Sequence, residues 1–81
     1  MDVDARGLLC PLPVLRLAKA IAVSPGWTRI RLLATDPDSQ ADVEAFCQAR
    51  GFRLVRATIG EILEFEIARY AQSESDPRTE N

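Results

Sequence analysis

The sequence of 81 residues contains no histidine and only two cysteines, Cys10 and Cys47. Without histidine, the chain cannot form the Cys–His pair that activates the nucleophile of thiol proteases. A structural zinc site would have to combine the two thiolates with carboxylates, and the cysteines lack the spacing of a zinc motif. We therefore expect the protein to bind no metal and no cofactor.

Long apolar runs and basic clusters are missing as well. No segment reaches the roughly eighteen apolar residues of a membrane span, and the N-terminus lacks the basic and then apolar stretch of a secretory signal. The formal net charge is −2, and the acidic excess lies in residues 71–81, so phosphate backbones find no concentrated positive charge. We expect a cytoplasmic protein that binds neither membranes nor nucleic acid directly.

The length of the chain limits its architecture. Eighty-one residues, 47% of them hydrophobic, suffice for one domain with one core. We assign residues 1–70 to this domain and expect residues 71–81, which have little to bury, to form a flexible acidic tail. A domain of this size has little room for an enclosed pocket, which favours a carrier without turnover of its own over a stand-alone enzyme.

Hydrophobic periodicity predicts the element order βαβαββ. The apolar residues Val14, Leu17, Ala18 and Ile21 fall on one stripe of a helix. The expected elements are a strand at 2–4, a helix from 11 to the turn at 25–26, a strand at 27–34, a helix from 35–39 to 51, and a hairpin of 52–58 and 61–70. They predict an α+β fold, a two-layer α/β sandwich in which both helices cover one face of a four-stranded mixed sheet.

Cys10 stands immediately before the first predicted helix and is followed by Pro11 and Pro13. Prolines suit the first turn of a helix because they lack the N–H groups that are unpaired there. If Cys10 is the N-cap, the helix dipole and the N–H groups of Leu12 and Val14 favour a thiolate, and they would equally hold a charged persulfide. The alternative is that Cys10 is a small buried apolar residue.

Other side chains have a structural interpretation that competes with a functional one. Cys47 lies on the apolar stripe of the second helix, where we interpret it as a core residue. Arg29 and Arg31 alternate with apolar residues, which favours a solvated strand face over a phosphate site. Arg16 and Lys19 are candidate contacts for a partner protein, although a wet helix face explains them as well.

Two strings connect the chain with a known family. D-A-R-G-L-L-C-P-L-P at residues 4–13 and A-T-D-P at 34–37 resemble the TusA/SirA/YedF family of sulfur carrier proteins, and the resemblance extends over residues 2–70. It implies the same sandwich fold and makes Cys10 the nucleophile that forms a persulfide. The residues that it implies as shaping this site are Pro11, Leu12, Pro13, Asp4 and Gly7.

By this resemblance, Cys10 accepts sulfane sulfur from a cysteine desulfurase or a rhodanese-like donor and relays it to a DsrE-type or other acceptor protein. Relatives serve tRNA thiolation, molybdenum-cofactor synthesis or sulfur metabolism, and we expect this protein to act as a monomer. A different class of function stays open, in which the chain is a thiol redox sensor or a regulatory protein-binding module. In that case Cys10 would be oxidised to sulfenic acid or joined to Cys47.

Overall fold

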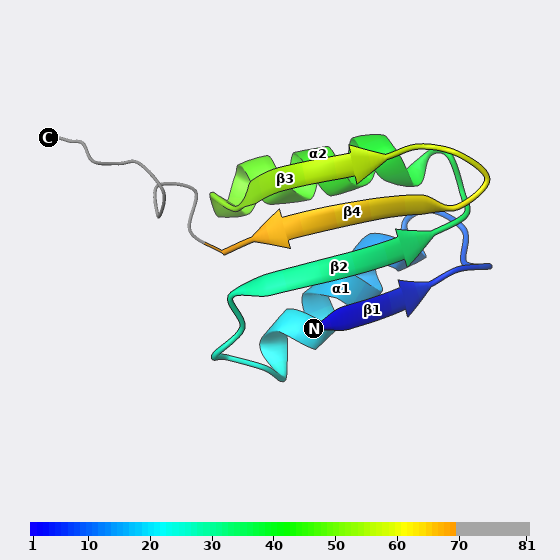
Figure 1. The fold of residues 1–81 in the computed structure, drawn as a ribbon. Coiled ribbons are helices and arrows are strands. Elements are labelled where there is room, and N and C mark those ends of the chain that lie inside the picture. Colours follow the sequence, from blue (N-terminus) through cyan, green and yellow to red (C-terminus); the bar gives the residue numbers. More distant parts are fainter. Residues whose placement is uncertain (70–81) are drawn as a thin grey trace, which may run out of the picture.

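The computed structural model of the protein describes residues 1–69, which form four strands and two helices (Figure 1). The predicted tail at 71–81 lies outside the described residues. No helix in the described part is long and apolar enough to cross a membrane. The elements are β1 (Asp2–Ala5), α1 (Leu12–Ala22), β2 (Arg29–Ala34), α2 (Ser39–Arg50), β3 (Arg53–Thr58) and β4 (Leu63–Ala68).

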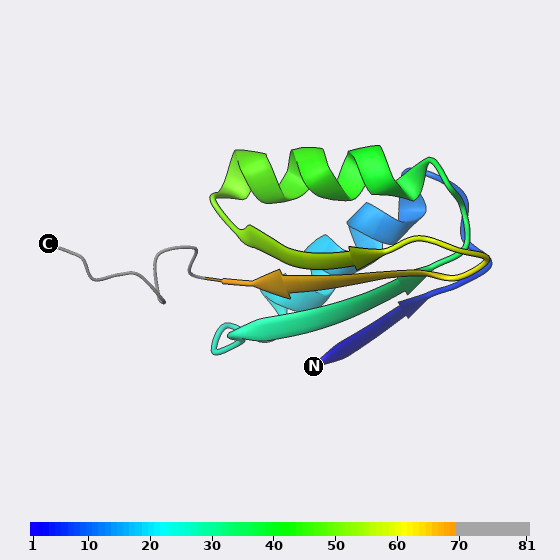
Figure 2. The ribbon, with the colours of Figure 1, turned by 45° about the horizontal axis from the view of Figure 1, so that its top comes forward.

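The strands form one mixed sheet in the order β1-β2-β4-β3. β1 and β2 are parallel, whereas β4 is antiparallel to both of its neighbours, β2 and β3. Figure 2 shows both helices on the same face of this sheet, as expected when two crossover connections have the same hand. The prediction of a two-layer α+β sandwich with helices on one face is confirmed.

The core lies between the helices and the covered face of the sheet. Because side chains alternate along a strand, Ile30 and Leu32 of β2 are buried while Arg29 and Arg31 face solvent. The helices contribute residues from the predicted stripes, and Leu17 and Val43 are fully buried. The largest fully buried side chains are Phe65, Leu17, Ile30, Leu32, Leu63, Ile67 and Val43.

The boundaries of some elements differ from the sequence prediction. The strand expected at 27–34 begins at Arg29, because Trp27 instead packs edge-on against Phe52 with ring centroids 4.9 Å apart. The last strand, expected from residue 61, begins at Leu63, because Thr58 pairs with Glu64 and the intervening residues form the turn. The first helix begins at Leu12 rather than at residue 11. This one-residue difference matters for the site described below.

Gly51 terminates α2 in the left-handed conformation, with φ of 75°. We expect Gly51→Ala to lower the free energy of unfolding by about 1 kcal/mol, since a Cβ disfavours positive φ. A Cβ there would meet no atom within 4 Å, so the cost comes from the backbone alone. Gly26→Ala is the matched control, because its Cβ also meets nothing within 4 Å and its φ lies outside the left-handed region. Urea unfolding of both variants measures the difference, and equal stabilities would contradict it.

Candidate functional site

Cys10 lies in the loop that follows β1, at the end of the sheet where β1 and β2 both have their carboxyl ends and α2 begins (Figure 1). Its side chain is exposed, which removes the interpretation as a buried apolar residue. The backbone N–H of Cys10 donates a 2.8 Å hydrogen bond to Oδ2 of Asp36, in the loop that follows β2. The position of the cysteine backbone is therefore fixed by a residue from the neighbouring parallel strand.

The thiol of Cys10 has a carboxylate as its partner. Its Sγ donates a hydrogen bond to Oδ2 of Asp42, in the first turn of α2. This bond is the largest cause of a raised pKa, because losing the proton would both break it and place two negative charges together. Burial and the charges of Asp42, Asp36 and Asp38 act in the same direction, and together they raise the pKa of Cys10 from 9.0 to about 11.

The expectation that the helix start favours a thiolate is therefore wrong for the free protein. Helix α1 begins two residues after Cys10, with Pro11 in the cap position, so Cys10 is not the N-cap. The N–H of Leu12, which was expected to face the sulfur, donates instead to the carbonyl oxygen of Leu9 at 2.8 Å. The carboxylate of Asp42 then determines the ionisation of the thiol.

Asp36 connects the two loops of the site. Besides accepting from Cys10, it accepts a 3.0 Å hydrogen bond from the backbone N–H of Asp38 through Oδ1. These two donors lower the pKa of the Asp36 carboxyl, so it stays charged in the neutral range. Next to it, Oγ1 of Thr35 accepts a 2.9 Å hydrogen bond from the N–H of Gly7, whose φ of 83° suits glycine.

The residues predicted to shape the site have distinct positions. Pro11 is exposed at the helix start, Pro13 is buried beneath it, and Leu12 is 47% exposed. The side chain of Asp4 binds its neighbour Arg6, with atoms 2.8 Å apart in the shorter contact, and this hydrogen bonding lowers the pKa of Asp4 to about 2. The side chain of Asp4 therefore contacts Arg6, in the segment between β1 and Cys10, and not the sulfur.

Arg16 and Lys19, the candidate partner contacts, are both exposed on α1. Nη1 of Arg16 donates a 3.2 Å hydrogen bond to the carbonyl oxygen of Asp4, which links α1 to the end of β1. Lys19 lies in the last turn of α1, whereas Cys10 precedes the first. Arg16 therefore contacts the end of β1, the strand that leads to Cys10, whereas Lys19 lies at the far end of the helix.

A surface hollow of about 490 Å³ opens beside the thiol. Cys10 and Asp42 lie together on its wall, and the remaining lining residues come from the loop before α2 and from its first turns. The lining residues are Cys10, Pro37, Asp38, Gln40, Ala41, Asp42 and Glu44. The sulfur is therefore open to solvent and to a partner molecule on this side, next to fixed negative charge.

Cys47 behaves as the sequence predicted, because it is 3% exposed and belongs to the core cluster. Burial raises the pKa of its thiol to about 11. Both cysteines are free thiols. With one thiol at the surface and the other in the core, the structure offers Cys10 alone for exchange with another protein.

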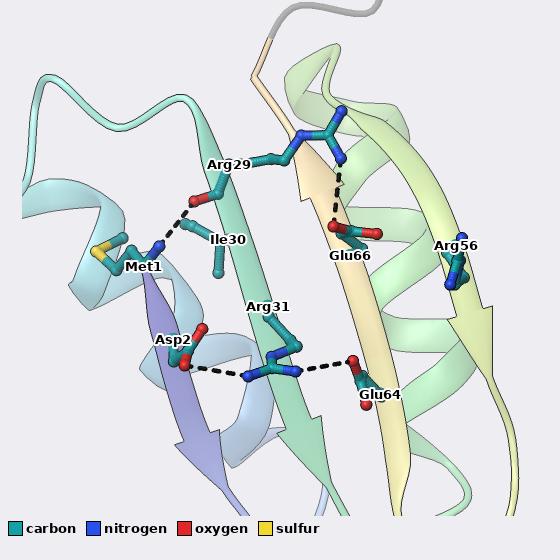
Figure 3. A pocket seen from close by; sticks show the side chains of 8 residues that line it. All are labelled: Met1, Asp2, Arg29, Ile30, Arg31, Arg56, Glu64 and Glu66. Atoms are coloured by element: carbon teal, nitrogen blue, oxygen red, sulfur yellow. Dashed lines mark hydrogen bonds and ion pairs between the residues drawn. The ribbon is translucent and has the colours of Figure 1, made fainter.

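A second hollow, of about 320 Å³, lies on the open face of the sheet (Figure 3). Arg29 and Arg31 line it, but each is paired with a carboxylate. Arg29 contacts Glu66 at 3.2 Å, and Arg31 contacts Asp2 at 3.3 Å and Glu64 at 3.4 Å. This face fits the prediction of a solvated, charge-balanced strand surface rather than a phosphate site.

Asp36 and Asp42 were not among the predicted site residues, although the sequence offered a signal for one of them. Cys10 follows β1 and Asp36 follows β2, and the carboxyl ends of adjacent parallel strands meet at one edge of the sheet. Asp42 had no comparable signal, because its distance from Cys10 depends on how α2 packs. Among residues 1–69, no three His, Cys, Asp or Glu side chains are placed to hold a metal ion.

Comparisons with known proteins connect this geometry with a family. The family model described as "Sulfurtransferase TusA" matches residues 1–69. The sulfur carrier protein TusA of Allochromatium vinosum is 38% identical over 56 residues, which cover 69% of this chain and 74% of that one. The sulfur carrier protein TusA of Pseudomonas syringae pv. syringae is 37% identical over 54 residues, or 67% of this chain and 64% of that one.

A solved structure with low sequence identity to this chain has the same fold. The crystal structure of a SirA-like protein from Desulfitobacterium hafniense superimposes with a TM-score of 0.72. The match covers 85% of this chain and 96% of that chain at 22% sequence identity. The two-layer arrangement seen here therefore occurs in an experimentally determined protein.

Proposed function

Because this chain belongs to the TusA family of sulfur carrier proteins, we propose that it carries sulfur as a persulfide on Cys10 and relays it between a donor and an acceptor protein. The observation that supports this most directly is the position of Cys10, exposed in a loop that Asp36 anchors and open to a surface hollow. A cysteine in this position is accessible to a second protein while its own backbone stays fixed.

The transfer needs no oxidant or reductant. In the loading step, Cys10–SH and a donor R–S–SH give Cys10–S–SH and R–SH. The Cys10 sulfur, as its thiolate, attacks the terminal sulfur of the donor, the S–S bond of the donor breaks, and the departing thiolate takes up a proton. Delivery is the same reaction with an acceptor thiol as the nucleophile. This chain therefore only holds and presents the sulfur, and the oxidation state of the sulfur does not change during the transfer.

The family resemblance suggests the partners of this relay. We place the relay in the cytoplasm, with a cysteine desulfurase or a rhodanese-like protein as donor and a DsrE-type or similar thiol protein as acceptor. The relay would serve tRNA thiolation, molybdenum-cofactor synthesis or sulfur metabolism. Leu9 and Leu12, which flank Cys10 in the chain, are 71% and 47% exposed and would add apolar contact with either partner.

Intact mass measurement tests the proposal. The reduced protein is incubated with a cysteine desulfurase and cysteine, or with a rhodanese and thiosulfate, and weighed without further reduction. We expect a gain of about 32 Da, the mass of one sulfur atom, which disappears after treatment with dithiothreitol. A second incubation with an acceptor thiol protein should move the added mass to that protein. Absence of an adduct with every donor would refute the proposal.

A further inference from the structure

The hydrogen bond between Cys10 and Asp42 gives the empty and the loaded carrier different environments at the same position. In the empty protein, the thiol is a donor and the carboxylate of Asp42 is its acceptor. Asp42 belongs to α2, whereas Cys10 belongs to the loop after β1, so the bond also joins two separate elements. This contact holds the sulfur beside the first turn of α2.

Loading Cys10 with sulfur removes the thiol proton on which this hydrogen bond depends. A persulfide is a stronger acid than the corresponding thiol, so loading shifts the sulfur toward its anionic form, which has no proton to donate. The anion would then face the Asp42 carboxylate, with Asp36 and Asp38 also close enough to affect the thiol electrostatically. Like charges at hydrogen-bond distance repel each other. Asp42 therefore attracts the thiol of the empty protein and repels the persulfide anion of the loaded protein.

We infer that Asp42 is a positioning residue that holds the empty Cys10 thiol and turns the loaded sulfur outward, an inference that rests on the proposed persulfide function. The backbone of Cys10 stays anchored to Asp36, so the change is confined to the side chain and the added sulfur. The terminal sulfur lies about 2.05 Å from Sγ, so rotation of the side chain can move it away from the carboxylate. The hollow beside Cys10 is open on this side and can accommodate the displacement.

The consequence is a difference in reactivity between the two states. The empty thiol is held protonated, which limits its reaction with small electrophiles while no donor protein is bound. The loaded sulfur is charged, exposed and available to an acceptor. Asp42 therefore increases the ratio between the reactivity of the loaded form and that of the empty form, which favours delivery in one direction.

The test measures this ratio directly. Empty and persulfide-loaded protein are each alkylated with iodoacetamide across a range of pH, and rate constants are taken from intact mass spectra. For wild type we expect a large loaded-to-empty ratio at neutral pH. Asp42→Asn should raise the rate of the empty form by about tenfold or more, because the carboxylate that disfavours the thiolate is gone. The loaded form should change much less, so the ratio falls by a similar factor.

Two further variants separate positioning from a general effect of charge or stability. Asp2→Asn removes the same charge from the open face of the sheet and should leave both rates unchanged. Asp42→Glu keeps the carboxylate and should restore a high apparent pKa for the empty thiol, at least in part. If Asp42 had a structural role alone, the pH profile of alkylation would not shift in Asp42→Asn and return in Asp42→Glu. An unchanged ratio in Asp42→Asn would refute the inference while leaving the proposed function intact.

Failure of the proposed function gives a different result. If no donor loads Cys10, the loaded arm does not exist and the persulfide proposal fails, and with it the inference. Alkylation of the empty protein then shows only whether Asp42 holds the thiol. Circular dichroism and urea unfolding of each variant show that the comparison is made between folded proteins.

Discussion

Replacing Cys10 with serine is expected to abolish sulfur loading completely. Serine preserves the size of the side chain and its hydrogen bond to Asp42, but its oxygen does not accept a sulfane sulfur. In the intact mass experiment, the gain of about 32 Da should vanish for Cys10→Ser with every donor. Because Cys10 is exposed, the substitution should leave the free energy of unfolding within about 0.5 kcal/mol of wild type.

Cys47→Ser is the matched control for this loss. It makes the same chemical change at the buried cysteine, so it should keep the mass gain while lowering the stability, because it buries a hydroxyl in an apolar core. If that variant does not fold, Cys47→Ala serves the same purpose with a smaller polar cost. A carrier that loads on Cys47, or that still loads after Cys10→Ser, would contradict the assignment of Cys10.

The second large effect concerns the pH dependence of the free thiol. A thiol whose pKa is about 11 rather than 9.0 ionises about a hundredfold less at neutral pH. Because a thiolate of higher pKa is also a stronger nucleophile, part of this loss is offset, and we expect iodoacetamide to modify empty Cys10 about tenfold more slowly than a cysteine in an unstructured peptide at pH 7. The rate should keep rising with pH through the region where the peptide has already levelled off, with a midpoint near pH 11.

The direction of this effect follows from the charge of the ionised form. The thiolate is the species that the surrounding carboxylates disfavour, so lower pH leaves the empty site unchanged and higher pH activates it. The groups responsible face the sulfur from two elements, with Asp42 and Asp38 at the start of α2 and Asp36 in the loop after β2. A midpoint at or below that of the peptide would show that the helix start controls the thiol after all. The measurement needs the protein in reduced form, with the buried Cys47 as an internal unreactive thiol.

Local patterns in the sequence determined most of the fold. Alternation of Ile30 and Leu32 with Arg29 and Arg31 predicts a half-buried strand, and the structure has that strand with those faces. The stripe that includes Val43 and Cys47 and the glycine at position 51 fixed the second helix and its end. These features depend on side chains a few positions apart, so the periodicity of a helix or strand is enough to reveal them. The starts of α1, β2 and β4 were missed by one or two residues, since packing and pairing across the sheet decide where an element begins.

The cysteine itself was also accessible to sequence reasoning. The proline context of Cys10 left a reactive and a buried cysteine both open, and the family resemblance favoured the reactive one; the structure has an exposed side chain. The sequence did not reveal the ionisation state of the Cys10 thiol. The sequence predicted a lowered pKa from the helix start alone, whereas the structure gives a raised one.

The difference has a physical cause. A pKa depends on charges and hydrogen bonds within a few ångströms, whatever their separation along the chain. Asp36 and Asp42 are 26 and 32 positions away from Cys10 in sequence, and both reach it only because β1 and β2 are parallel neighbours and α2 begins at the same end of the sheet. The sequence by itself determined the elements and the layers, and its family resemblance singled out Cys10 as the residue that we propose to carry the chemistry. The tertiary structure alone decided which carboxylate holds the proton of that residue.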